Sequence, residues 1–357
     1  MEQVKPIKIS HGDLWATKTY VNDFVESPDG SRLLYRYFSD PANQPPNIAD
    51  RSHAAQVWTC RPDGTDRRKL FDIPPELNES FHGSESMVWL SNDKFYLNGM
   101  LYSFDAGRII WRLPNPADPR REISAWSYPA KGKLFVNIRT GSNKGYYWID
   151  PYGSDIPKLN YFIGRDEIYP FLGGEPEEYN YTYIFLSTAG SNVYFVLYYR
   201  QVEYGFTCRE DGSGLVQVGN NHKKQLPWNG HTIWFDDDHL AFPCSPEQNT
   251  KMCDRFGENM RVIGGKSNHV TVSPDRKWVA CDDWDPATYN PTFVRLYPFG
   301  STEAVADLMG DDERPTSNER LHTHPSFSRD GWGVYYLGRY GHLAAIYYAD
   351  VSKWTKP

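Results

Sequence analysis

Long apolar runs are missing from this chain of 357 residues. No stretch of about 18 consecutive apolar residues occurs, which argues against a membrane-spanning helix. The opening residues, MEQVKPIKISHGDLW, lack the apolar core of a secretory signal. The sequence therefore predicts a cytoplasmic protein with no membrane partner.

Cysteine is scarce, and its spacing forms no motif. The five cysteines are odd in number and none belongs to a Cys-x-x-Cys pair, which argues against a disulfide framework and a thiolate zinc site. We expect reduced thiols buried in strands. Basic runs are also missing and the net charge is −7, so nucleic acid is not expected as a partner. An anionic substrate would need locally placed cations or a metal ion.

Aromatic and turn-forming residues, in contrast, are abundant. Aromatics make up 15% of the chain, with 25 Tyr and 12 Trp, and 28 Gly and 26 Pro are spread along its length. This composition is typical of many short strands joined by turns. No long helical periodicity is present. We therefore predict an all-β fold.

A hairpin made of two apolar strands and a turn carrying Asp, Asn or Gly recurs along the chain. It is clearest in FVESPDGSRLLYRYF, HVTVSPDRKWVACDDW and PSFSRDGWGVYYLGRY, and its seven copies begin near residues 24, 86, 124, 183, 231, 269 and 325. A second hairpin lies between copies, as in residues 56–71 and 204–218. Two hairpins make the four strands of one propeller blade. The sequence predicts a single seven-bladed β-propeller domain over residues 1–357.

The connections and the chain ends complete the predicted architecture. Residues 40–54, 165–180 and 310–322 are expected to be loops between blades. The last copy ends with the chain, so residues 6–16 are expected to supply its outer strand and close the ring.

Histidines stand immediately before the first strand of three successive copies. His322 and His324 precede the seventh copy, and in an extended backbone two residues so spaced turn their imidazoles to one side. His269 and His231 take the matching places in the sixth and fifth copies. First strands line the channel of a propeller, so these side chains are expected to converge at its mouth. The imidazoles of His322 and His324 together with the carboxylate of Glu319 suit Mn, Fe, Zn or Ni. The four histidines as a set predict a metal or catalytic site, although any single histidine could instead have a structural hydrogen-bonding role.

The C-terminal stretch ERLHTHPSFSRDGWGVYYLGRYGHLAAIYYADVSKW resembles the end of the oligogalacturonate lyases. Members of that family are seven-bladed propellers that cleave short pectin fragments in the cytoplasm by metal-assisted β-elimination. The likeness in order and blade placement runs from about residue 200 to the end of the chain. It implies a lyase with an acidic, uronate-containing oligosaccharide as substrate and a divalent cation, expected to be Mn²⁺, as cofactor.

The resemblance implies a set of metal ligands. The family pattern Gln-x-x-His-x-His before a Pro-Ser-Phe strand is matched by Glu319, His322 and His324. A further metal histidine of the family is matched by His269. The replacement of the family glutamine by Glu319 adds a negative charge beside the ion.

The implied catalytic residues match the family in part. The family's catalytic histidine lies in a His-x-x-Trp segment, matched by His231 and by Trp234, which is expected to contact substrate. The family's catalytic arginine precedes an Asp-Gly turn, and alignment on that turn places Tyr204 there. Tyr204 could protonate the leaving oxygen or stack on a sugar. Arg200 or Arg209 could take the arginine's place, and we expect Arg209 to bind substrate.

The implied reaction explains why these groups belong together. Removal of the C5 proton of a uronate places negative charge on its carboxylate, and a divalent cation bound there stabilises the enolate-like state. A neutral imidazole such as that of His231 can accept the proton near neutral pH.

Two other interpretations stay open. The copies SPDGSRLLY and SPDRKWVA also resemble the repeats of TolB-type propellers, which bind sugars or proteins without catalysis. A metal-dependent isomerase or hydrolase would keep the metal site and change the reaction. The histidine set favours an enzyme, because a scaffold has no need of histidines at three successive blade mouths. Asp282 and Asp283 are compatible with a position facing the channel or with a turn.

Overall fold

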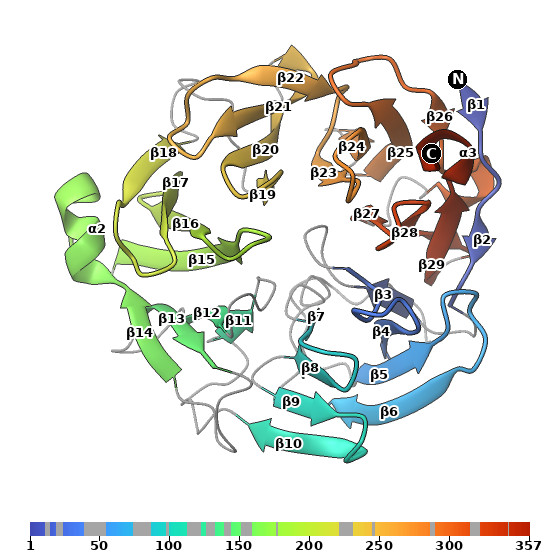
Figure 1. The fold of residues 1–357 in the computed structure, drawn as a ribbon, viewed down its shortest axis with the longest axis horizontal. Coiled ribbons are helices and arrows are strands. Elements are labelled where there is room, and N and C mark those ends of the chain that lie inside the picture. The colour runs from blue at the N-terminus through green and yellow to red at the C-terminus, as the bar shows by residue number, and fades with distance from the viewer. Residues whose placement is uncertain are drawn as a thin grey trace. The chain divides into compact units, whose positions relative to one another are not determined.

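Strands dominate the computed structural model and form seven sheets (Figure 1). Six of these sheets have four strands and one has five. The fold is a seven-bladed β-propeller, as predicted. The structure describes residues 1–10, 15–18, 24–38, 55–73, 87–97, 100–112, 123–125, 133–138, 144–150, 159–175, 178–220, 231–244, 247–285, 290–314, 322–341 and 343–357.

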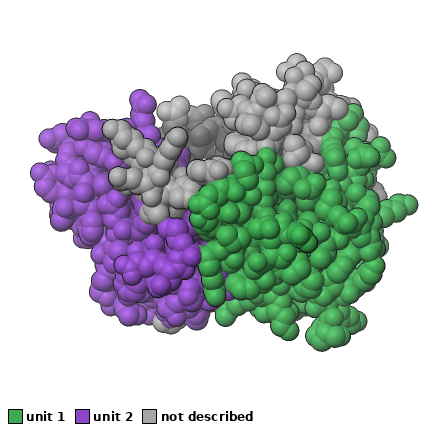
Figure 2. Space-filling model, turned by 90° about the horizontal axis from the view of Figure 1, so that it is seen from above, with its two compact units in different colours: residues 1–84, 243–251, 261–357 green, residues 85–242, 252–260 purple. Residues whose placement is uncertain are grey.

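One compact unit comprises residues 1–84, 243–251 and 261–357 and holds three complete blades (Figure 2). The first blade contains β3 (Trp15–Lys18), β4 (Leu33–Phe38), β5 (Ala55–Cys60) and β6 (Arg68–Ile73). The sixth blade contains β23 (His269–Val272), β24 (Trp278–Asp285), β25 (Asn290–Pro298), β26 (Ala306–Asp307) and the added β1 (Glu2–Gln3). The seventh blade contains β27 (Ser326–Phe327), β28 (Gly333–Tyr340), β29 (Leu343–Asp350) and β2 (Ile7–Lys8).

The other compact unit comprises residues 85–242 and 252–260 (Figure 2). The second blade contains β7 (Met87–Trp89), β8 (Lys94–Leu97), β9 (Met100–Ser103) and β10 (Arg108–Arg112). The third blade contains β11 (Ile123–Ala125), β12 (Leu134–Ile138), β13 (Gly145–Ile149) and β14 (Leu159–Ile163). The fourth blade contains β15 (Tyr179–Leu186), β16 (Asn192–Tyr199), β17 (Val202–Arg209) and β18 (Val216–Asn220).

The remaining sheet is the fifth blade. It contains β19 (Ile233–Trp234), β20 (His239–Cys244), β21 (Asn249–Asp254) and β22 (Arg261–Gly264). In the second to fifth blades the strands pair in chain order, with the first strand of the predicted copy at one edge of the sheet. The sixth and seventh blades follow the same order and end on the N-terminal strands β1 and β2. A single domain over residues 1–357 stays a prediction.

Local side-chain hydrogen bonds explain where the predicted hairpins turn. A serine hydroxyl donates to the aspartate two residues later, at 2.6 Å, in Ser27–Asp29, Ser273–Asp275 and Ser328–Asp330. Each aspartate also accepts a hydrogen bond from the backbone N–H two residues further on. Because the Ser-x-Asp unit satisfies its own polar groups, the turn forms from local sequence alone.

The first blade departs from the predicted copy. β3 pairs with β4 from Trp15↔Phe38 to Lys18↔Tyr35, and an isolated bridge joins Glu26 to Leu33. The copy at residues 24–38 therefore supplies β4 and one bridge of the first strand. The named first strand, β3, lies upstream of that copy.

The N-terminal residues complete the seventh blade. Ile7 and Lys8 of β2 pair antiparallel with Tyr348 and Tyr347 of β29. This pairing confirms the predicted origin of the blade's outer strand. Just before it, β1 pairs in parallel with β26 and gives the sixth blade its fifth strand.

Helices are few among the described residues. The prediction of a loop over residues 165–180 was wrong in part, because α2 (Arg165–Leu172) forms there and buries Ile168 in the core of the fourth blade. Two shorter helices are η5 (Asp311–Glu313) and α3 (Ser352–Thr355). No described helix is both long and apolar enough to cross a membrane.

The five cysteines all lie in strands, where their thiols are free and buried. The prediction of buried, reduced cysteines is therefore confirmed. Burial raises the pKa of the Cys60, Cys253 and Cys281 thiols to about 12. These thiols stay protonated at neutral pH and act as small apolar side chains.

Candidate metal centre

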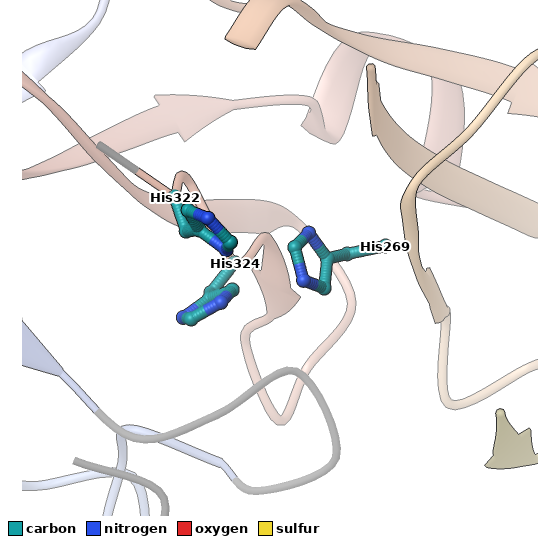
Figure 3. A group of neighbouring side chains, drawn as sticks. All are labelled: His269, His322 and His324. Carbon is teal, nitrogen blue, oxygen red and sulfur yellow. The ribbon is translucent and has the colours of Figure 1, made fainter. Parts of the chain in front are cut away.

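Three histidines from the sixth and seventh blades meet at one point (Figure 3). His269 is the first residue of β23, while His322 and His324 stand just before β27. Ring centroids are separated by 5.5 Å between His269 and His322, 4.5 Å between His269 and His324, and 5.4 Å between His322 and His324. Figure 3 shows the imidazole of His269 directed toward the other two rings.

The spacing of the ring nitrogens fits a single ion. One nitrogen from each of the three rings lies within 4.8 Å of the other two. Metal–imidazole bonds are about 2.0–2.1 Å long, so two nitrogens on one ion lie up to about 4.2 Å apart. Small rotations of the rings would bring all three to that separation. His269 and His324 are buried and His322 is only partly so, which leaves one side of the cluster open.

The carboxylate of Asp282 contacts the Nδ1 atom of the His269 ring. Strand register places the two residues opposite each other on β24 and β23. The Nδ1 atom of His269 lies 2.9 Å from Oδ2 and 3.1 Å from Oδ1 of Asp282, and the backbone N–H of His269 donates to Oδ1 at 2.7 Å. Because Nδ1 is engaged by the carboxylate, Nε2 is the ring atom that can bind a metal. The sequence left a channel-facing position and a turn open for Asp282, and the structure places it in β24, opposite His269.

The Asp282 carboxylate also reaches the segment that carries the other two histidines. Thr323 Oγ1 donates a hydrogen bond to Asp282 Oδ2, and the Thr323 carbonyl accepts one from Leu337 N–H at 2.8 Å. Burial tends to raise the pKa of Asp282, but its electrostatic interaction with His269 and the hydrogen bonds from His269 and Thr323 hold it below its usual range. The carboxylate is therefore ionised at neutral pH.

The backbone at His324 is not extended. Its φ of +43° lies in the left-handed region, which is uncommon for residues other than glycine. The prediction that an extended backbone aligns His322 and His324 was therefore wrong at His324, although the two rings do come together. A left-handed residue costs roughly 1–2 kcal/mol, so the surrounding contacts must hold this conformation in place.

A buried cation lies beside the same segment. Lys18, at the end of β3, is fully buried, and its Nζ donates to Ser326 Oγ at 3.0 Å. Ser326 comes two residues after His324. The buried ammonium group of Lys18 favours negatively charged groups near this segment. Glu319, the predicted fourth ligand, lies outside the described residues.

The predicted catalytic residues belong to the second compact unit. His231 precedes β19 and is partly buried. Tyr204 lies opposite Leu197 and packs against the core of the fourth blade. Since β17 is the third strand of that blade, Tyr204 is two strands away from the first strand, β15.

The two candidate arginines lie at opposite ends of β17. Arg200 occupies the tight turn before β17, is exposed, and holds Glu178 with an Nη2–Oε2 distance of 3.2 Å. Tyr179, the first residue of β15, pairs with Tyr199, so Arg200 lies at the blade end where the first strand begins. His269 takes the corresponding end of its own blade. Arg209 pairs with Asn192 at the other end.

Trp234 lies on β19 and joins two blades. Its indole Nε1 donates to the carbonyl of Phe185 on β15 at 3.0 Å. The indole N–H therefore serves a contact between the first strands of the fourth and fifth blades. Its predicted contact with substrate, through the ring face, stays a prediction.

No known protein family and no curated protein matches the sequence. Among solved structures, an oligogalacturonate lyase from Vibrio parahaemolyticus is similar at 13% identity, with a TM-score of 0.63 over 98% of this chain and 94% of that chain. An oligogalacturonate lyase in complex with manganese is similar at 14% identity, with a TM-score of 0.60 over 98% of both chains. A Mycobacterium tuberculosis puromycin-hydrolyzing peptidase gives 12% identity and a TM-score of 0.58, over 99% of this chain and 55% of its own. The chain thus has the seven-bladed propeller fold that the oligogalacturonate lyases have, in agreement with the resemblance of its C-terminal sequence.

Proposed function

We propose that this protein is a metal-dependent lyase that cleaves a uronate-containing, oligogalacturonate-like oligosaccharide by β-elimination. The observation that carries the proposal is the cluster of His269, His322 and His324, with a carboxylate behind one ring. Manganese, present in a lyase structure of the same fold, is the proposed ion. Glu319 is the proposed fourth ligand.

The proposed mechanism assigns a role to each residue of the site. The three histidines would hold the ion, and a divalent cation bound there would stabilise the negative charge that develops on the uronate carboxylate. His231 accepts the C5 proton. Tyr204 protonates the leaving oxygen, or Arg200 takes the place of the family's catalytic arginine there. Trp234 binds the sugar chain, whereas the contact of Arg209 with substrate stays a prediction, because Arg209 lies at the other end of β17 from Arg200. The buried thiols are compatible with the reducing cytoplasm, where we place the protein.

Metal analysis of the purified protein tests the first half of the proposal. We expect one divalent ion per chain in the wild type and none in His322→Ala/His324→Ala, with an unchanged far-ultraviolet spectrum, because neither residue lies in a strand. His239→Ala is the matched control, since His239 pairs with Asp236 in another turn and should keep the ion. Full metal content in the double variant would place the site elsewhere.

Product analysis tests the second half. Digestion of a panel of uronate oligosaccharides should release an unsaturated, ultraviolet-absorbing product, and chelation should stop the release. A protein that binds metal without forming this product would instead be a metal-dependent isomerase or hydrolase. A protein that binds sugar with no turnover and no metal would be a binding propeller.

A further inference from the structure

One carboxylate contacts both segments that supply the candidate ligands. Asp282 accepts hydrogen bonds from the backbone N–H of His269 and engages its Nδ1. It also accepts the hydroxyl hydrogen of Thr323, which stands between His322 and His324 in the chain. Asp282 and Thr323 are both buried, so these bonds form away from bulk water.

We propose that Asp282 is a positioning residue that fixes the metal-binding tautomer of His269 and, through Thr323, holds the His322–His324 segment against it before any ion arrives. This inference rests on the proposed metal site. A carboxylate only accepts hydrogen bonds when ionised, so it selects the His269 tautomer that carries its proton on Nδ1. That tautomer presents the lone pair of Nε2 to the cluster.

The hydrogen bond from Thr323 to Asp282 stands next to a strained backbone conformation at His324. His324 adopts a φ of +43°, which persists only where neighbouring contacts enforce it. Thr323 is fixed on both sides, by its hydroxyl on Asp282 and by its carbonyl on Leu337 N–H. Loss of the hydroxyl would free the segment to relax, and the imidazole of His324 would move away from its partners.

Asp283 provides a matched control on the same strand. It is nearly as buried as Asp282, with 4% against 2% exposed, but its Oδ2 lies 2.5 Å from Lys266 Nζ. Side chains of successive strand residues point to opposite faces. Asp283→Asn therefore makes the same chemical change in the same strand without touching the histidines.

Nitrogen NMR of metal-free protein carrying ¹⁵N-labelled histidine reads the tautomer directly, with His269→Gln used to assign its signals. We expect the wild type and Asp283→Asn to show His269 protonated on Nδ1. In Asp282→Asn the bias should disappear, because an amide can either donate to Nδ1 or accept from it. An unchanged tautomer in Asp282→Asn would overturn the positioning role.

Mn²⁺ affinity, measured by competition with a chelator, reads the consequence for the ion. Loss of an outer-shell partner of a ligand typically lowers affinity about 10–100-fold, and we expect that loss in Asp282→Asn and a smaller loss in Thr323→Val. Thr323→Ser and Asp283→Asn should bind as the wild type does. The variant Asp282→Asn/Thr323→Val should be no weaker than Asp282→Asn, because Thr323 acts through that carboxylate.

The outcomes separate the two proposals. A wild type with the expected tautomer that takes up no ion would overturn the proposed function and leave the positioning role standing. Strong metal binding that is equal in Asp282→Asn and wild type would do the reverse. If Asp282→Asn fails to fold, Thr323→Val and Thr323→Ser still decide, since they change the hydroxyl and keep the carboxylate: equal affinity in these two variants would overturn the role of Thr323.

Discussion

His269, His324 and His231 stand before or at the start of a blade's first strand, yet each is held differently. His269 is fixed by a carboxylate on the adjacent strand. His324 is fixed by a left-handed backbone within a hydrogen-bonded segment. His231 is partly buried and precedes β19 in another compact unit. The first two arrangements suit the proposed ligands, whose imidazoles must keep a fixed position.

Replacement of His231 by alanine tests its proposed task. We expect His231→Ala to retain one ion per chain and to lose about 10²-fold or more in turnover, the usual scale for removing a general base. Metal content and the initial rate of elimination at saturating substrate are the measurements.

Tyr204→Phe, assayed alongside, separates two proton-transfer roles. Whichever substitution removes turnover while substrate binding persists marks the essential group. An active His231→Ala protein would contradict the assignment and make Tyr204 the candidate base.

The residues of the centre differ in how far the sequence could predict them. His269, His322 and His324 could be found because histidine is rare and their places in the repeat coincide. Asp282 could not be chosen over Asp283, because the strand register that sets His269 opposite Asp282 is a tertiary property. The conformation of His324 could not be predicted either, since the His-x-His pattern does not indicate a positive φ.

At the scale of elements, the hairpins depend on turns in which glycine takes a left-handed conformation. Gly257, in the turn between β21 and β22, has φ +81°, and a Cβ added there would lie 2.6 Å from the Val218 carbonyl oxygen. Gly300, after β25, has φ +82° with open space around it. The two positions share a conformation and differ in their surroundings.

This difference predicts unequal costs for the same substitution. Gly300→Ala should lower the free energy of unfolding by about 1–2 kcal/mol, the cost of placing a Cβ in the left-handed region. Gly257→Ala should cost clearly more, because its Cβ overlaps backbone that cannot rotate away. Urea unfolding of both variants measures the difference, and equal midpoints would show that the turn moves to admit the methyl group.

Turns were also the elements that the sequence predicted best. The Ser-x-Asp hydrogen bonds of Ser273–Asp275 and Ser328–Asp330 are local, so the pattern alone is enough to identify them. β3 was missed because its pairing with β4 joins residues outside the recognised copy. The helix α2 was missed because it has only eight residues and contains Pro170.

At the scale of the whole molecule, a buried carboxylate joins the first blade to the seventh. Glu26 Oε2 accepts the backbone N–H of Arg329 at 2.6 Å, and Oε1 accepts the Tyr335 hydroxyl at 2.9 Å. Burial raises the pKa of Glu26; the two hydrogen bonds and the Arg329 charge oppose the rise, and the Asp330 charge adds to it. The fold therefore holds the Glu26 proton more tightly than the unfolded chain does.

The raised pKa of Glu26 predicts that its contribution to the free energy of unfolding falls as pH rises. The contribution of protonated Glu26 is fully present below its unfolded pKa and is lost as pH rises through the higher folded pKa. The difference in unfolding free energy between wild type and Glu26→Gln should therefore shrink as pH increases across the acid range. Urea titrations of both proteins at a series of pH values measure it. A difference that stays constant or grows with pH would contradict the prediction.

The pairing of β1 and β2 has a consequence for the time course of folding. Residues 2–8 leave the ribosome well before β26 and β29, the strands they pair with. The sixth and seventh blades cannot gain these edge strands until β26 and β29 have been synthesised. Contacts so distant in sequence are slow to form, because loop-closure entropy is lost before the contact is gained. The edge of β29 is therefore exposed to wrong pairing during synthesis until residues 7–8 pair with it.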